Sequence, residues 1–424
     1  MRNIDCIQTL AELDLVLRAI PRSAPTGLGE MIDRIIEGVR NEGEPFILRE
    51  CQRFAPKLNT IVVGKSDLEN AAISEPLAQA IQAAAKNIRA FHELLKPGRV
   101  KFSPVEGVSC ERIPLGISRV GLYVPGGDTP LISSLLMQAI PAQIARCGEL
   151  VLCTGANKDG VIDPALLWTA NLLGITEVYA ISGATAIATM AFGTPTIRPV
   201  YKITGPGSEF VNQAKLAVQR DGVCAIDLPA GPSELVVVID GTVRSDFIAA
   251  DIISQAEHSP DTFTAVISTD RGALERVRSE LELQVSSRQR RAILGSSLES
   301  TLFIEVRSTE VSIQIVNALA PEHVILSGAS VESLVPSLTS AGTVFVGEYT
   351  PESLGDYLSG MNHILPTKGG ARAYSGCSVE TYTKWMGVQR SSLEGLRALS
   401  EPIKNLALAE GLDGHAYAVA VRLS

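Results

Sequence analysis

Hydrophobic positions in the first hundred residues recur at the spacing of amphipathic helices. The spacing is clearest in residues 11–20, 27–43 and 75–98, and the last of these runs ends in a Lys-Pro-Gly turn. No convincing series of short apolar runs, of the kind that indicates strands, occurs before residue 98. We therefore predict a mainly helical N-terminal region.

From about residue 116 the pattern changes to short apolar runs that alternate with longer helical ones. One series covers residues 117–222 and a second covers residues 235–347, with the turn-rich segment 229–234 between them. This alternation is typical of β–α–β units with parallel sheets. We predict an α/β protein with two parallel-sheet domains and a helical tail from about residue 378.

Composition and charge exclude several functional classes. The chain is 46% hydrophobic and 20% charged, so it can build a core. Its net charge is −9 and no basic block occurs, which argues against nucleic-acid or membrane partners. No run approaches the roughly 20 apolar residues of a membrane helix. Charges interrupt the N-terminal segment, and the seven cysteines form no C-x-x-C pair, so we expect a cytoplasmic protein without a signal peptide.

Glycine-rich turns give only a weak sign of a nucleotide site. The chain lacks the G-x-G-x-x-G pattern of nicotinamide enzymes and has instead glycine clusters at residues 124–130 and 204–209. The second cluster lies between a predicted strand and helix, where backbone N–H groups can face a phosphate. A sharp bend without a ligand explains the same residues.

The histidines are few, and most lie beside carboxylates or amides. Of five, His258, His323, His363 and His415 are in such company, as expected of metal ligands or general bases. Gln255 and His258 share one face if their helix continues, and together they offer an amide oxygen and an imidazole to one ion. The alternative is that His258 only caps the helix end.

Two further acidic segments complete the candidates. Glu322 and His323 enter a strand, at the edge where α/β sheets place their sites if this is the carboxyl end, or face solvent otherwise. Asp356 offers a hard oxygen ligand in a glycine-rich segment. Glu410 and His415 lie so near the C-terminus that they reach a site only if the tail folds back or crosses to another subunit.

Taken together, the motifs resemble those of the histidinol dehydrogenase family, which uses zinc and NAD in the last steps of histidine synthesis. The resemblance covers nearly the whole chain. It rests on these segments: GLYVPGG, GPG with the following helix, AIDLPAGPSE, AADIISQAEHSPD, APEHV, AGTVFVGEYTPESLGDYLSGMNHILPT and EGLDGHA.

The resemblance implies a role for each matching residue. The zinc ligands would be Gln255, His258, Asp356 and His415, with His415 supplied by the partner subunit, and Glu322 and His323 would be the catalytic pair. Substrate contacts would fall on the four ligands, on His323, and on Ser233, Tyr357, His363 and Glu410.

The resemblance also implies the architecture. It predicts two incomplete Rossmann-like domains with a helical N-terminal arm and a helical C-terminal tail, in an interlocked homodimer. The segments would be an arm (1–19), a domain with the metal and catalytic residues (20–122 with 233–377), a nucleotide-side domain (123–232) and a dimerisation tail (378–424).

The cofactor side departs from the family pattern. Tyr123 matches, but the usual G-G-A-Q-A is here SGATA, with Thr185 in place of the nucleotide-binding Gln, and the usual G-P-G-N is GPGS, with Ser208 in place of Asn. The metal and catalytic motifs are intact. An altered cofactor pocket suits a paralogue with a different substrate or acceptor.

The implied chemistry is oxidation of L-histidinol to L-histidine through a bound aldehyde. His323 would take the alcohol proton while hydride passes to NAD, and Glu322 would activate water to attack the aldehyde. Three alternatives stay open: a zinc- and NAD-dependent dehydrogenase of another small amino alcohol or hydroxy compound, a zinc hydrolase or lyase, and an idle binding protein.

Overall fold

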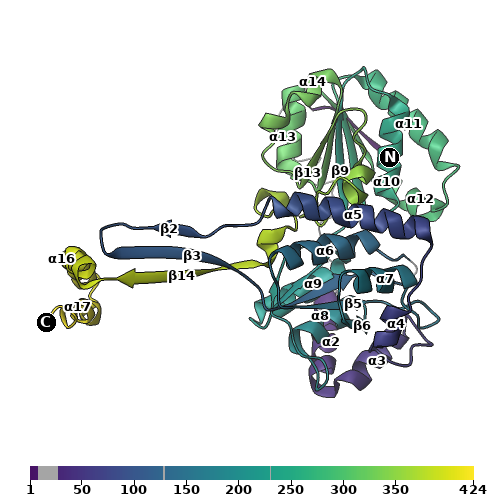
Figure 1. The fold of residues 1–424 in the computed structure, drawn as a ribbon. Coiled ribbons are helices and arrows are strands. Elements are labelled where there is room, and N and C mark those ends of the chain that lie inside the picture. The colour runs from purple at the N-terminus through teal and green to yellow at the C-terminus, as the bar shows by residue number, and fades with distance from the viewer. Residues whose placement is uncertain (8–26, 128, 230) are drawn as a thin grey trace.

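The structure is a computed structural model that describes residues 1–7, 27–127, 129–229 and 231–424. Two lobes, each built on a parallel sheet, lie against each other, and a long arm projects from the body (Figure 1). This confirms the predicted α/β fold with two parallel-sheet domains. Among the helices that the described residues form, none has both the length and the apolar character to cross a bilayer.

One lobe contains a six-stranded sheet in which every strand pair is parallel. In spatial order its strands are β1 (Arg2–Ile7), β11 (Leu302–Val306), β10 (Phe263–Ser268), β9 (Glu234–Ile239), β12 (His323–Ser327) and β13 (Thr343–Val346).

The edge strand β1 corrects the predicted helical arm over residues 1–19. Residues 2–7 form a strand that pairs with β11, about 300 positions along the chain. The helix predicted over residues 11–20 lies outside the described residues. The pairing partner decides the conformation of so short a segment, and local sequence does not reveal that partner.

Side chains of the six-stranded sheet alternate between two cores. Val236 and Val238 pack on the face covered by α13, whereas Leu235 and Val237 pack on the face covered by α10 and α11. Burial on both faces explains why these strands have continuous apolar sequences. The helices of this lobe are α10 (Ser245–Ala256), α11 (Arg271–Val285), α12 (Arg291–Glu299), α13 (Thr309–Leu319) and α14 (Ala329–Glu332).

The other lobe contains a five-stranded parallel sheet. In spatial order its strands are β6 (Glu177–Ala180), β5 (Glu149–Thr154), β4 (Arg119–Val124), β7 (Lys202–Thr204) and β8 (Ala225–Ile226). Its helices are α2 (Leu28–Glu42), α3 (Glu44–Gln52), α4 (Lys65–Glu69), α5 (Glu75–Glu93), α6 (Ile132–Ile144), α7 (Pro164–Leu172), α8 (Gly183–Phe192) and α9 (Glu209–Arg220).

The N-terminal helices belong to this five-stranded lobe. Ile32 and Ile36 of α2 share one core with Leu122 of β4 and Ile187 of α8. The predicted boundaries placed residues 20–122 in the domain of the six-stranded sheet. In the structure, the helices of this segment pack in the five-stranded lobe instead. The apolar stripe of α2 faces α8 and α9, so these helices complete the core of the lobe that follows them in sequence.

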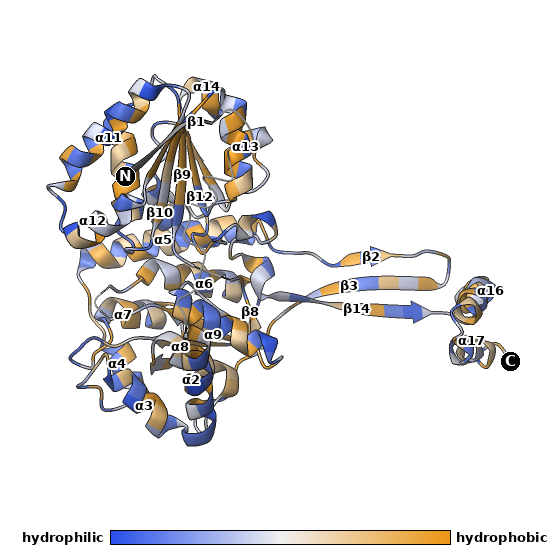
Figure 2. Ribbon diagram, turned by 180° about the vertical axis from the view of Figure 1, so that it is seen from behind, coloured by the Kyte–Doolittle hydropathy of each residue, from blue (hydrophilic) through white to orange (hydrophobic). Residues whose placement is uncertain are grey.

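The arm is a three-stranded antiparallel sheet that carries two helices at its tip (Figures 1 and 2). Its strands are β2 (Val100–Phe102), β3 (Val108–Gly116) and β14 (Thr383–Ser391), and its helices are α16 (Leu393–Ala409) and α17 (Asp413–Ala420). The tail was predicted to be helical from about residue 378, so β14 is a correction. No position along β3 or β14 is fully buried, so these strands lack the apolar run by which the core strands were predicted.

Candidate active site

The candidate catalytic residues lie at the amino ends of strands in the six-stranded sheet. His323 is the first residue of β12, Glu322 precedes it, and Ser233 directly precedes β9. The sequence analysis expected a site here only if Glu322 and His323 lay at the carboxyl end of the sheet. They lie at the amino end instead. The amino edge suits a carboxylate because strand N–H groups face it: the Glu234 N–H donates to Glu322 Oε2 at 3.0 Å.

This edge meets the carboxyl ends of the five-stranded sheet. The N–H of Lys368 donates to Glu234 Oε1 at 3.0 Å, and its ammonium pairs with Glu209 in the first turn of α9. His363 Nε2 lies 3.1 Å from the Ser134 hydroxyl in the first turn of α6. The candidate site therefore lies where the two lobes touch.

Helix α10 brings Gln255 and His258 to this junction. The helix ends at Ala256, earlier than the prediction required, and a turn carries His258 beyond it. The Nδ1 atom of His258 lies 3.1 Å from the carbonyl oxygens of both Ser254 and Gln255. A proton on Nδ1 satisfies these carbonyls and leaves Nε2 free to bind an ion, so capping and ligation are compatible.

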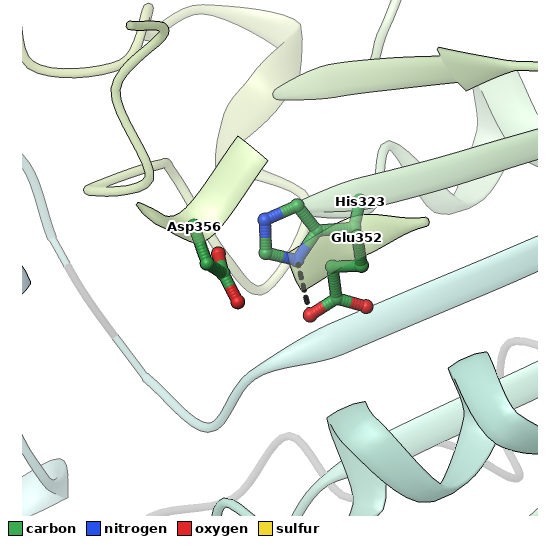
Figure 3. Close-up of side chains that lie close together, drawn as sticks. All are labelled: His323, Glu352 and Asp356. Atoms are coloured by element: carbon green, nitrogen blue, oxygen red, sulfur yellow. Dashed lines mark ion pairs between the residues drawn. The ribbon is translucent and has the colours of Figure 1, made fainter. Parts of the chain in front are cut away.

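The short helix α15 (Glu352–Tyr357) supplies two more acids. Glu352, fully buried, was not among the predicted site residues, and Figure 3 shows it beside His323 and Asp356. The Nδ1 atom of His323 lies 3.6 Å from Glu352 Oε1 and 3.9 Å from Glu322 Oε2. One ligand atom from each of His323, Glu352 and Asp356 falls within 4.8 Å of the others, a spacing that one metal ion can span.

His363 joins the same group, whereas Tyr357 lies at its edge. The Nδ1 atom of His363 lies 3.0 Å from the Asp356 carbonyl oxygen and 3.7 Å from Asp356 Oδ1. Tyr357 is 57% exposed at the end of α15. His363 therefore contacts Asp356, whereas Tyr357 is exposed to solvent.

Burial shifts the protonation of this centre strongly. It raises the pKa of Glu322 and of Glu352 well above the usual carboxyl range, and the neighbouring acids add to the shift of Glu352. Burial also raises the pKa of Asp356. It lowers the pKa of His363, and that of His323 to about 3. Without a cation, burial therefore favours the uncharged forms of these acids and of the His323 and His363 rings; a divalent ion would favour the carboxylates instead.

The predicted cofactor residues lie on the five-stranded lobe. The hydroxyl of Tyr123, at the carboxyl end of β4, accepts from the Gly183 N–H at 3.1 Å at the start of α8. Thr185 is buried in the first turn of α8, and Ser208 is exposed directly before α9. They border the carboxyl ends of neighbouring strands, where α/β sheets bind ligands.

A buried ion pair, which the sequence analysis missed, supports the turn before Ser208. Lys215 and Asp227 form this pair, with side chains almost wholly excluded from solvent. Lys215 Nζ donates to the Gly205 carbonyl at 3.1 Å, and the Gly205 N–H donates to Asp227 Oδ2 at 2.8 Å. Gly205 has φ 126°, and a Cβ there would lie 2.0 Å from the Tyr123 carbonyl oxygen, so only glycine fits.

Two predicted residues are not brought to the centre. Glu410 and His415 are exposed at the tip of the arm, in the turn after α16 and in α17, and Figure 1 shows that tip far from both lobes. Within this chain they do not complete the site.

The chain is similar to known proteins over almost its entire length. The family model described as histidinol dehydrogenase matches residues 21–423. A histidinol dehydrogenase of Xylella fastidiosa is 43% identical over 397 residues, which cover 93% of this chain and 92% of that protein. One of Bacteroides thetaiotaomicron is 40% identical over 400 residues, 94% of this chain and 93% of that protein. The crystal structure of histidinol dehydrogenase from Elizabethkingia anophelis superposes with a TM-score of 0.94 at 38% identity, covering 100% of this chain and 98% of that one.

Proposed function

The chain belongs to the histidinol dehydrogenase family, oxidoreductases of the last steps of histidine biosynthesis, and on that premise we propose that it oxidises L-histidinol to L-histidine with zinc and NAD. The observation that carries the proposal is the buried centre at the lobe junction. There the Glu322–His323 pair lies beside the side chains of α10 and α15. The relatives do not favour another substrate, a hydrolase or lyase, or an idle protein.

The donor groups fit a zinc ion. Gln255 offers an amide oxygen, His258 the free Nε2 and Asp356 a carboxylate, a nitrogen and oxygen set that zinc accepts, as do manganese and cobalt. When bound, zinc would supply a Lewis acid that accepts the lone pairs of the substrate's amine and imidazole nitrogens. Ser233, Tyr357 and His363 border the centre and would contact the rest of the substrate.

His323 is the proposed base for the alcohol. Burial lowers its pKa, so the ring is neutral at physiological pH and keeps a nitrogen lone pair for the alcohol proton. With the Nδ1 proton directed at the acids beside it, Nε2 accepts the alcohol proton. NAD, held by the lobe that carries Tyr123, Thr185 and Ser208, would supply a hydride acceptor for each of the two oxidations.

Glu322 is the proposed base for the aldehyde step. Burial raises its pKa, so its ionised form is a stronger base than an exposed carboxylate. Its oxygen is held by the Glu234 N–H, so the group is fixed while it takes a proton from water. That water attacks the aldehyde carbon, and the second oxidation gives the carboxylate.

A second subunit completes the proposed site. His415 and Glu410 lie on the arm, which extends outward as if to reach a neighbouring copy (Figure 2). The tip of the arm exposes large apolar side chains, which are Leu393, Leu406, Leu408, Leu412, Tyr417 and Val421. Burial of this surface against another copy would stabilise an interlocked homodimer and deliver His415 as the fourth ligand.

The test is turnover of the purified protein with zinc. We expect NADH to form from NAD and L-histidinol, and L-histidine to accumulate with two NADH per molecule. A panel of other small amino alcohols serves as the comparison. If another alcohol is oxidised and L-histidinol yields no NADH, that alcohol class, and not L-histidinol, is the substrate.

A further inference from the structure

Glu352 is a fully buried acid at the centre of the site that the proposed chemistry does not use. It is the first residue of α15, and its side chain is fully buried between α10 and the start of β12. Resting on the proposed zinc and base roles, we propose that Glu352 is a positioning residue that orients both the amide of Gln255 and the ring of His323.

The first contact fixes the amide of Gln255. Gln255 has no exposed surface, and its amide end lies against both carboxylate oxygens of Glu352. An amide oxygen there would face only acceptors, so the amide nitrogen must face Glu352, and it then donates to Oε2 at 2.6 Å and also to Oε1. The amide oxygen is thereby turned away from Glu352. Only that oxygen can bind a metal, because the amide nitrogen has no free lone pair.

The second contact sets which nitrogen of His323 carries the proton. Glu352 Oε1 is 3.6 Å from His323 Nδ1, so it attracts a proton on Nδ1. Nε2 then keeps its lone pair, as a base requires. Glu322 lies farther from the same nitrogen, at 3.9 Å, and already accepts from the Glu234 N–H.

A direct role of Glu352 as a metal ligand is the competing explanation. Its carboxylate is close enough to His323 and Asp356 to share an ion with them. However, both its oxygens already face the amide nitrogen of Gln255, and one also faces His323. A carboxylate occupied in this way supports ligands more naturally than it binds the ion itself.

The test compares zinc affinity in four proteins by chelator competition: wild type, Glu352→Ala, Gln255→Ala and the double variant. If Glu352 acts through Gln255, Glu352→Ala should weaken zinc binding by about 10- to 100-fold, and should weaken it little further in the Gln255→Ala background. Independent losses that multiply in the double variant would make Glu352 a ligand and overturn the proposal. Unchanged affinity in Glu352→Ala would overturn it as well.

A second readout needs neither zinc nor activity. With only five histidines in the chain, ¹⁵N NMR of the metal-free protein can assign the His323 ring with the His323→Asn variant as reference. At a pH that ionises Glu352, we expect wild type to carry the proton on Nδ1 and Glu352→Ala to shift it toward Nε2. If both proteins show the same tautomer, Glu352 does not set which nitrogen of His323 carries the proton. Glu348→Gln, an exposed acid four positions earlier, is the matched control.

These measurements separate the inference from the proposed function. Failure of wild type to oxidise L-histidinol would remove the substrate but leave the zinc and tautomer comparisons interpretable. Thermal unfolding of each variant identifies any that fail to fold. The isosteric Glu352→Gln variant, which keeps the volume and one carbonyl acceptor, then replaces Glu352→Ala in both comparisons.

Discussion

Glu322 and His323 are consecutive residues, yet burial shifts their pKa values in opposite directions because it disfavours whichever form is charged. The acid then holds its proton more tightly and the imidazole remains neutral. The neutral imidazole can accept the alcohol proton, and the carboxylate of Glu322, once ionised, is a stronger base toward water than an exposed carboxylate.

This division of roles can be tested on two substrates. We expect His323→Asn to lower turnover of L-histidinol by about 10²–10⁴-fold, the usual contribution of a positioned base. Glu322→Gln should slow oxidation of the aldehyde more than oxidation of the alcohol. Steady-state rates with each substrate measure both effects. An equal loss on the two substrates would contradict the separate roles.

Metal binding should depend on pH through Asp356. Burial raises its pKa, so a zinc ion must displace a proton from it. We expect zinc to raise the melting temperature more at about pH 8 than at about pH 5. The raised pKa of Glu352 gives the metal-free protein stability that should be lost as pH rises from the ordinary carboxyl range through that raised pKa, because the unfolded chain has already released a proton that the folded acid retains. Scans with zinc and with chelator separate these effects, and Asp356→Ala should abolish the zinc effect.

The role of Ser208 in the predicted cofactor site can be tested by substitution, because Ser208 is exposed. Ser208 stands where the family usually has Asn, and its shorter side chain reaches less far from the start of α9. One restored hydrogen bond is worth about 0.5–1.5 kcal/mol, so Ser208→Asn should tighten NAD binding by about 2- to 13-fold. Titration of NAD measures this. Thr185→Gln is the harsher comparison because Thr185 is buried. Equal affinity in wild type and Ser208→Asn would mean that the substitution is neutral.

Residue motifs predicted much of the centre but not Glu352. Gln255, His258, Glu322, His323, Asp356 and His363 were all named from sequence, and the structure brings them together. Glu352 carries no signal of its own, since an acid at the start of a helix is common on protein surfaces. Its contacts with Gln255 and His323 arise only when three distant segments meet.

At the scale of elements, the core strands were predictable and the arm was not. The central strands β4, β9 and β10 are buried on two faces and have continuous apolar sequences, so their positions follow from the pattern. The strands of the arm bury neither face within one chain. The sequence also did not predict which lobe the N-terminal helices join. An apolar stripe shows that a helix packs against something, but it does not identify the partner.

The turn between β7 and α9 depends on its buried ion pair. Lys215→Met should leave Asp227 buried without its cation, at a cost of about 3–5 kcal/mol in unfolding free energy. Lys57→Met, which breaks the exposed 2.5 Å pair with Asp159, should change stability little. Urea unfolding of both variants measures the difference. Similar losses would show that the buried pair does not hold this turn.

At the scale of the whole molecule, the proposed dimer would make two chains one functional unit through the arm. We expect the inactive variants His323→Asn and His415→Asn to complement each other when they are unfolded together and reassembled. Each mixed dimer then has one site with an intact His323 and an intact tail from the partner. Random assortment makes half the dimers mixed, which restores about a quarter of wild-type activity. If each tail served its own lobe, no activity would return.

The pairing of β1 with β11 has a consequence for synthesis on the ribosome. The strand made first needs a partner that ends at Val306, about 300 residues later. At about 5–20 residues per second, that interval lasts about 15–60 s. The five strands and the helices of the other lobe, within residues 28–226, emerge in the meantime, but its core also takes Ile364, Cys377, Val379 and Tyr382 from much later in the chain. The nascent chain therefore carries most of one lobe and an unpaired strand segment, and both cores are completed only after residue 306 has been made.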